Sequence, residues 1–143
     1  MREELKTRID GDKSQVFCIW RHRWVRLTPE EWVRQQFLHH LVEELAYPSG
    51  RIGVEVAIHV GDVSKRCDAI VYDAYMRPWM LLEFKAESVA LTQRTLDQAA
   101  VYNRKLKAPY LILSNGPKTI AACVTENRIE FLNELPHYSV PGS

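Results

Sequence analysis

Apolar residues recur every three or four positions between residues 33 and 45, which is the spacing of a helix that buries one face. Thr28 followed by Pro29 marks its start, because threonine caps a helix and proline suits its first turn. Glu31 lies three residues after Thr28, the spacing of a capping box. A Pro-Ser-Gly segment then ends the pattern. We therefore predict a helix over about 29–46.

The pattern changes to that of strands after this helix. Residues 54–60 alternate apolar and more polar side chains, which predicts a strand with one buried face. A second helical pattern covers 92–107, and the segment 110–116 begins with a continuous apolar run typical of a strand buried on both faces. Four further strands are predicted over 66–73, 79–86, 119–124 and 129–132.

The predicted order is α-β-β-β-α-β with extra strands, which favours an α/β fold with a mixed central sheet flanked by helices. Residues 1–14 are polar and charged, and we expect a frayed or short helical start there. Residues 15–26 predict a strand or an arm, and residues 136–143 a loose tail. No repeat or linker divides the chain, so 1–143 is expected to be one domain.

The chain has 143 residues, of which 46% are hydrophobic, and a net charge of +1. This length and apolar content suit one folded domain, and the charge excludes a strongly basic, histone-like binder but not a local basic surface. The three cysteines and five histidines show neither disulfide nor zinc spacing. With no membrane-spanning or signal segment in the sequence, we expect a cytoplasmic protein.

Two charged residues interrupt the apolar segment 79–86. Glu83 and Lys85 are two positions apart, so on a strand their side chains share one face. An acid and a base at the end of a buried strand are unfavourable unless they are paired or functional. The pair is therefore a candidate site.

Asp68, in the preceding predicted strand, adds a second carboxylate. If 66–73 and 79–86 form an antiparallel hairpin, the numbers of opposed residues sum to roughly 151 or 152. The first register places Asp68 beside Glu83 on one face. The second places it opposite Phe84 and needs a bulge. Both registers bring the two carboxylates close together.

Adjacent carboxylates repel each other, and a divalent cation relieves the repulsion. Oxygen ligands without Cys or His favour Mg²⁺ or Mn²⁺ over zinc. Lys85 is suited to orient a water molecule or to stabilise charge on a phosphate. These residues predict metal-assisted hydrolysis of a phosphodiester bond.

Asp68, followed by Glu83-Phe84-Lys85, resembles the signature of the PD-(D/E)XK nuclease superfamily. The element order is similar to the αβββαβ core of restriction endonucleases. Over residues 16–132 the chain resembles the N-terminal nuclease domain of type I restriction enzyme R subunits. The segments that carry this likeness are LTPEEWVRQQFLHHL, RCDAIVY, LLEFKA, QAAVYN and LSNG.

The resemblance implies a role for each residue of the motif. Asp68 and Glu83 would bind Mg²⁺ or Mn²⁺, with the backbone carbonyl of Phe84 as a third ligand, and Lys85 would be the catalytic lysine. Cys67 stands before Asp68 where the family pattern has proline. This departure leaves the metal role of Asp68 intact.

Both helices carry further residues that the resemblance implies are functional. Glu30, four residues before Arg34, matches an acidic residue that assists the metal site; Glu31 is the competing choice, although the capping box favours a structural role for Glu31. On the second helix, Gln98 and Tyr102 match a QxxxY pattern. The alternative for this glutamine and tyrosine is that they satisfy polar atoms where helix and sheet meet.

DNA is the implied partner. Three arginines, interleaved with Trp20 and Trp24, are candidates for contacts along a phosphate backbone; the alternative is an amphipathic strand with solvated arginines. These residues are Arg21, Arg23 and Arg26, and Tyr102 is a further candidate for contact with DNA.

The sequence carries no GxxxxGK[ST] motif and has no room for a helicase motor, so translocation-dependent restriction is not expected of this chain alone. The predicted function is a metal-dependent endonuclease. The alternative is a catalytically inactive nuclease fold that binds DNA or assembles with partners. Other restriction-system subunits are expected partners, and a homodimer is a further possibility.

Overall fold

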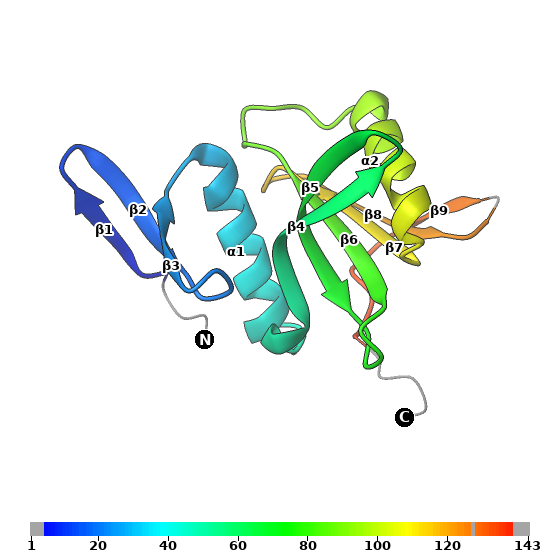
Figure 1. Cartoon of the computed structure of the whole chain (residues 1–143), viewed down its shortest axis with the longest axis horizontal. Helices are drawn as coiled ribbons and strands as arrows, with labels where there is room; N and C mark the ends of the chain where they lie inside the picture. Colours follow the sequence, from blue (N-terminus) through cyan, green and yellow to red (C-terminus); the bar gives the residue numbers. More distant parts are fainter. Residues whose placement is uncertain (1–4, 127, 139–143) are drawn as a thin grey trace.

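The structure, a computed structural model, describes residues 5–126 and 128–138. It contains a three-stranded and a six-stranded sheet, and the first helix lies between them (Figure 1). The helices are α1 (Pro29–Glu43) and α2 (Gln93–Leu106), and a short 3-10 turn covers Ser49–Arg51. The strands are β1 (Thr7–Asp10), β2 (Lys13–Cys18), β3 (Arg23–Arg26), β4 (Ile52–Val60), β5 (Val63–Tyr72), β6 (Pro78–Phe84), β7 (Tyr110–Ser114), β8 (Thr119–Val124) and β9 (Ile129–Leu132).

The larger sheet has the order β4-β5-β6-β7-β8-β9. Strands β4, β5 and β6 form an antiparallel meander, and α2 provides the crossover to β7, which is parallel to β6. Strands β8 and β9 then complete the sheet with antiparallel pairings. The mixed sheet and the order of its elements confirm the predicted α/β fold.

Both faces of this sheet are covered by a helix. On one face Leu38 and Leu41 of α1 belong to the same core as Leu82 of β6. On the other, Leu96 of α2 packs in a second core with Leu81. Adjacent residues of β6 therefore point into different cores, as the alternation of side chains along a strand requires.

Thr28 caps α1, as the sequence predicts. Its side-chain oxygen accepts a hydrogen bond from the backbone nitrogen of Glu31 at 3.0 Å. The Glu31 carboxylate takes no part in a reciprocal cap and binds arginines instead. The helix ends at Glu43, a few residues before the predicted end.

The expectation for residues 1–14 is wrong where the structure describes them. Residues 7–18 form the hairpin β1–β2, and residues 1–4 lie outside the described part of the chain. Gly11, with a φ of +64°, forms the tight turn between the two strands. The guanidinium of Arg8 also packs 4.2 Å from the ring centroid of Trp24 on β3, a contact between residues far apart in sequence.

The expectation of a loose tail is also wrong for its described residues. The ring of Tyr138 packs against Trp79 and Tyr47, and its hydroxyl donates to the carbonyl oxygen of Tyr72 at 2.9 Å. The remainder of the predicted tail, 139–143, lies outside the described residues. Within the described part of the chain, no helix has the length and apolar character needed to cross a bilayer.

Candidate active site

Asp68 on β5 and Glu83 on β6 are neighbours. The two strands pair Ala69 with Leu82 and Ile70 with Leu81, so the register continues to place Asp68 opposite Glu83. This is the first of the two registers considered from the sequence. An Asp68 carboxylate oxygen also accepts a hydrogen bond from the backbone nitrogen of Phe84, at 2.7 Å.

The Glu83 carboxyl group lies in an unfavourable environment for a negative charge. It is only 8% exposed. Burial, and after it the charge of Asp68, raises the pKa of Glu83 to about 8, against an opposing effect from Lys65. Two carboxylates at one buried position thus compete for the same positive charge or proton.

Lys65 provides a positive charge that the sequence analysis missed. Its ammonium nitrogen lies 3.1 Å from Oε1 of Glu83 and 4.3 Å from the ring centroid of Tyr102 on α2. Contact with an aromatic face attracts a cation in addition to the ion pair. Lys65 therefore connects the second helix to the carboxylate pair.

A twist in the β4–β5 hairpin explains why Lys65 reaches this position. Val54 packs in the core under α1, whereas Val56 and Ile58 pack in the core under α2, although strict alternation would place all three on one face. Glu55, between them, has a φ of 55°, in the left-handed region that residues other than glycine seldom adopt. Lys65 pairs with Ile58 across the hairpin and so turns toward α2 with it.

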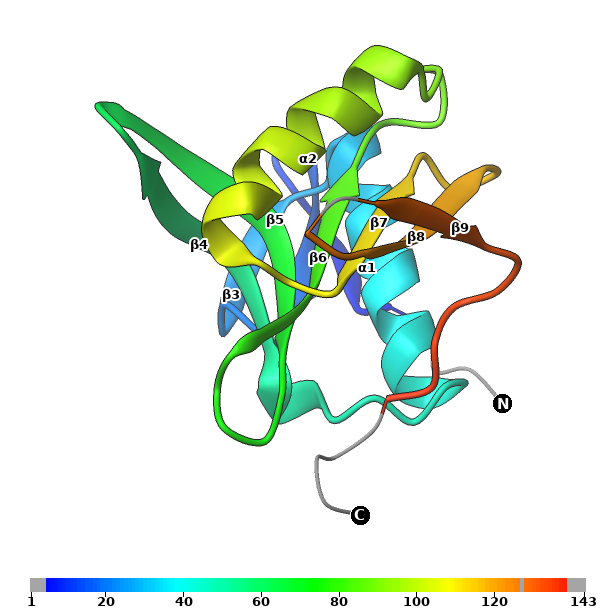
Figure 2. The ribbon, with the colours of Figure 1, turned by 90° about the vertical axis from the view of Figure 1, so that its right-hand side faces the viewer.

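The same twist corrects the predicted strand 54–60, whose buried side chains belong to two faces. The hairpin extends beyond the rest of the sheet beside α2 (Figure 2). Asp68, Glu83 and Lys65 therefore lie together at the base of this extension.

Asp68 and Lys85 both lie within electrostatic range of Glu30. Burial raises the pKa of Glu30, and the charge of Asp68 raises it further, while Lys85 lowers it. Lys85 is half-buried and is held through its backbone nitrogen, which donates to the carbonyl oxygen of Ser114 at 2.9 Å. The structure therefore brings Glu30, Asp68, Glu83 and Lys85 to one region.

Glu31 has structural contacts on α1. Its carboxylate oxygens lie 2.6 Å from Nη2 of Arg21 and 2.8 Å from Nη2 of Arg34, and the Gln35 amide donates to it at 3.0 Å. Burial alone would raise the pKa of Glu31, but the hydrogen bonds from the two arginines outweigh it and hold this pKa below its usual value. These contacts leave Glu30 as the residue of the two that faces Asp68.

Arg34 is a second residue that the sequence analysis did not place in the site. It links the Glu31 ion pair to Asp68, whose Oδ1 lies 3.6 Å from its Nη1. Its side chain is 9% exposed. The spacing of Glu31 and Arg34, three residues apart on a helix, is the sequence signal for the ion pair, whereas the contact with Asp68 depends on the fold.

The three arginines expected to face DNA lie in different environments. Arg23 and Arg26, on β3, are exposed. Arg21 departs from the expectation, because its side chain is 11% exposed and its nitrogens lie 2.6 Å from both Glu31 and Glu55. A guanidinium held by two carboxylates is part of the internal ion network.

The two residues of the QxxxY pattern also differ. Tyr102 is half-buried and reaches Glu83 through Lys65. Gln98 lies on the exposed side of α2. The helix thus contributes Tyr102 to the surroundings of the carboxylates.

A metal ion at this site would depend on few protein ligands. Among residues 5–126 and 128–138, no three His, Cys, Asp or Glu side chains form a group that could hold a metal ion. Asp68 and Glu83 nevertheless form an oxygen donor pair, and burial together with the repulsion from Asp68 raises the pKa of Glu83. Such a pair fits a hard divalent cation that takes its other ligands from backbone oxygen and water.

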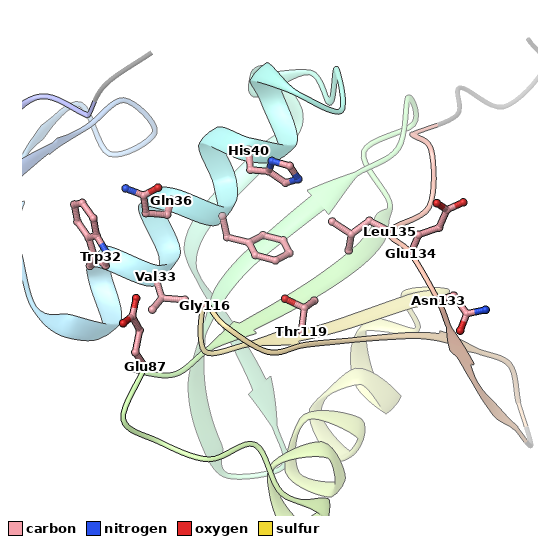
Figure 3. Close-up of a pocket in the computed structure, with 11 residues that line it drawn as sticks. Trp32, Val33, Gln36, His40, Glu87, Gly116, Thr119, Asn133, Glu134 and Leu135 are labelled. Atoms are coloured by element: carbon pink, nitrogen blue, oxygen red, sulfur yellow. The ribbon is translucent and has the colours of Figure 1, made fainter. Parts of the chain in front are cut away.

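A cavity of about 600 Å³ lies elsewhere, between α1 and the segment after β9. Figure 3 shows Trp32 and His40 of α1 on one side and Leu135 on the other. None of the residues predicted to be functional lines this cavity. The candidate active site is therefore distinct from it.

Comparisons with known proteins agree with this architecture. A family described as type I restriction enzyme R protein N terminus (HSDR_N) matches residues 29–136. A fragment assigned to the HsdR subunit of a type I restriction enzyme from Vibrio vulnificus YJ016 is similar in structure, with a TM-score of 0.56 and 19% identity. The similarity covers 77% of this chain but only 24% of that one.

A protein from Anabaena variabilis ATCC 29413, assigned as a nuclease of the DUF820 group, has a TM-score of 0.49 and 9% identity, over 88% of this chain and 80% of its own. A search of curated proteins gave no match. The similarity to the HsdR fragment shows that the two chains share a fold. Since the family match extends over most of the sequence, the chain belongs to the family of type I restriction enzyme R protein N termini.

Proposed function

We propose that this domain is a metal-dependent deoxyribonuclease that hydrolyses phosphodiester bonds. One observation carries the proposal: Asp68 and Glu83 lie side by side on paired strands, with Glu83 almost fully buried. The pairing occurs in a chain of the type I R-protein family. A buried acidic pair is unfavourable for folding alone, which supports a functional role.

Asp68 and Glu83, with the backbone carbonyl of Phe84, would hold Mg²⁺ or Mn²⁺. The bound cation would supply Lewis acidity toward the phosphate and lower the pKa of a coordinated water molecule. Lys85, which directly follows the last residue of β6, orients the attacking water and offsets the negative charge that develops on the phosphate.

Four further residues would support the carboxylates. Glu30 adds an acceptor beside Asp68, and its raised pKa reflects burial and that proximity. Arg34 fixes Asp68 from α1. Gln98 and Tyr102 extend the site along α2, where Tyr102 already contacts Lys65. Precise orientation of reacting groups accounts for much of the rate that enzymes achieve.

DNA is the proposed substrate, and the exposed Arg23 and Arg26 are the proposed backbone contacts, with Arg21 acting through the ion network. The chain spans 24% of the HsdR fragment to which it is similar. We therefore propose that it works with other subunits of a restriction system for any activity beyond strand cleavage. The cytoplasmic location and the homodimer stay predictions from the sequence.

Cleavage assays test the proposal. Purified protein is incubated with linear and supercoiled DNA in Mg²⁺ or Mn²⁺, alongside Asp68→Ala and Lys85→Ala. Glu130→Ala is a matched control, because Glu130 on β9 has an exposed side chain (60%). Cleavage by the parent and the control, but not by the two site variants, is the expected result. Equal cleavage by every protein, or none by the parent, contradicts the proposal.

A second candidate function is a catalytically inactive module that binds DNA or assembles with partners. It is favoured by the contacts that Glu83 and Asp68 already make with Lys65 and Arg34, since these arginine and lysine charges offset the carboxylates without a metal. Calorimetric titration with Mn²⁺ separates the two candidates. Binding that is lost in Glu83→Ala supports the nuclease, and absence of binding supports the inactive module.

A further inference from the structure

Lys65 occupies a position between three elements of the fold. Its backbone belongs to β5, its ammonium lies 3.1 Å from Glu83 on β6, and the same ammonium lies 4.3 Å from the ring centroid of Tyr102 on α2. The Lys65 side chain is 26% exposed, and that of Glu83 is 11% exposed. The lysine therefore reaches from solvent into a mostly buried acidic pair.

Lys65 differs from the other cation at the pair. Arg34 is 9% exposed and is held by the Glu31 carboxylate at 2.8 Å, so its charge is fixed in place. The lysine has a flexible four-carbon stem with a single charged end, and among its contacts with residues 5–126 and 128–138 only Glu83 is an anion. Lys65 can thus leave Glu83 by rotation of its own side chain.

A divalent cation and the Lys65 ammonium would compete for the same carboxylate. Oε1 of Glu83, the atom that Lys65 contacts, is one of the oxygens available to a metal bound by the acidic pair. Two cations at adjacent positions repel each other. Metal binding to Glu83 therefore favours movement of the ammonium toward another anion, and a DNA phosphate in the site provides one.

Resting on the nuclease function proposed above, we propose that Lys65 is the counter-ion of Glu83 in the metal-free protein and a phosphate-binding residue once a divalent cation occupies the pair. Lys65 is thus a second lysine of the site, contributed by β5, in addition to Lys85, which directly follows β6. Tyr102 guides its ammonium between the two positions, because the ring face attracts the cation without neutralising it.

Calorimetric titration with Mn²⁺ at a fixed pH above about 8, where the Glu83 carboxyl group is ionised, tests the first half of the proposal. Lys65→Met keeps the aliphatic stem and removes the charge. Lys105→Met makes the same change on the exposed surface of α2 and is the control. Loss of a competing cation should tighten Mn²⁺ binding about fivefold in Lys65→Met, as expected for a partly buried ion pair, and leave Lys105→Met near the parent.

DNA binding in Mn²⁺ tests the second half. Lys65→Met and Lys105→Met are each combined with Lys85→Ala. This third substitution retains the acidic pair and removes the lysine proposed for cleavage. Lys65→Met should weaken DNA binding and lower the slope of log affinity against log salt by about one phosphate contact. Lys65→Arg retains the charge and should recover most of the loss. A residue with a merely structural role would not tighten metal binding while weakening DNA binding.

The outcomes distinguish failure of this inference from failure of the proposed function. If the parent binds Mn²⁺, with binding lost in Glu83→Gln, and Lys65→Met binds it equally or more weakly, the counter-ion role is wrong and the nuclease proposal stands. Tighter Mn²⁺ binding with unchanged DNA binding overturns the phosphate role. A parent that binds no Mn²⁺ overturns both proposals.

Discussion

Arg34 contacts Asp68 at two of its oxygen atoms: its Nη1 lies 3.6 Å from the carboxylate Oδ1 and 3.4 Å from the backbone carbonyl oxygen. The same guanidinium binds Glu31. The buried Arg34 side chain thereby connects α1 to Asp68, the candidate metal ligand on β5. The helix and the carboxylate are coupled through this single arginine.

Replacement of Arg34 by methionine should destabilise the protein strongly. It leaves the buried Glu31 with one arginine in place of two, and removal of one partner from a buried ion pair typically costs about 3–5 kcal/mol. Denaturant unfolding measures the change. Arg66→Met is the control, because Arg66 also binds a carboxylate but is 72% exposed, and its loss should cost less than about 1 kcal/mol. Similar losses in the two variants would show that burial of Arg34 has no energetic consequence.

Glu31 should contribute to acid sensitivity. Arg21 and Arg34 outweigh the effect of burial and hold the pKa of Glu31 below its ordinary value of 4.5. The stability that its ionised form provides is therefore complete above pH 4.5 and is lost as the pH falls through the lower, folded-state pKa. Glu31→Gln should be less stable than the parent at neutral pH, with the difference shrinking in acid. A difference that stays constant with pH in thermal unfolding would contradict this.

Glu83 should have the opposite effect on stability. Burial and Asp68 raise its pKa from 4.5 to about 8, so the metal-free protein loses stability as the pH rises from 4.5 through 8, by at most roughly 1.4 kcal/mol for each pKa unit. Glu83→Gln cannot ionise and should lack this loss. Thermal unfolding in a chelator across this range measures both proteins, and parallel curves would exclude the raised pKa.

Arg23 and Arg26 should contribute to DNA affinity without affecting stability. Both are exposed on β3, so replacing each by alanine should lower the salt slope of DNA binding by about one unit and leave unfolding unchanged within about 0.5 kcal/mol. Arg21→Ala is the informative comparison, because Arg21 is bound by Glu31 and Glu55 and its loss should destabilise the fold. If neither β3 variant changes the slope of log DNA affinity against log salt concentration, the DNA contacts lie elsewhere.

The parts of the fold set by local patterns could be predicted from the sequence. Thr28 and Pro29 identify the start of α1, and alternation along 66–73 and 79–86 restricts the register enough to bring Asp68 and Glu83 together. Lys65 could not be placed in this way. Its orientation depends on the twist at Glu55, which reverses the faces that alternation assigns.

The N-terminal strands show the same limit. The turn at Gly11 is local, but β1 and β2 are stabilised by distant contacts such as that of Arg8 with Trp24. A polar segment with few apolar residues has a weak pattern of its own. Its strand conformation therefore becomes evident only when the partner strands are known.

The match to the family begins at Pro29, after the turn between β2 and β3 that carries Arg21. The Arg21 side chain nevertheless contacts two residues inside the matched region, Glu31 and Glu55, each at 2.6 Å. A polypeptide that begins at Pro29 would therefore lack the guanidinium that contacts Glu31 and Glu55. The segment that matches the family is thus shorter than the ion network beside the candidate active site, and shortening the protein to that segment would remove Arg21 from the network.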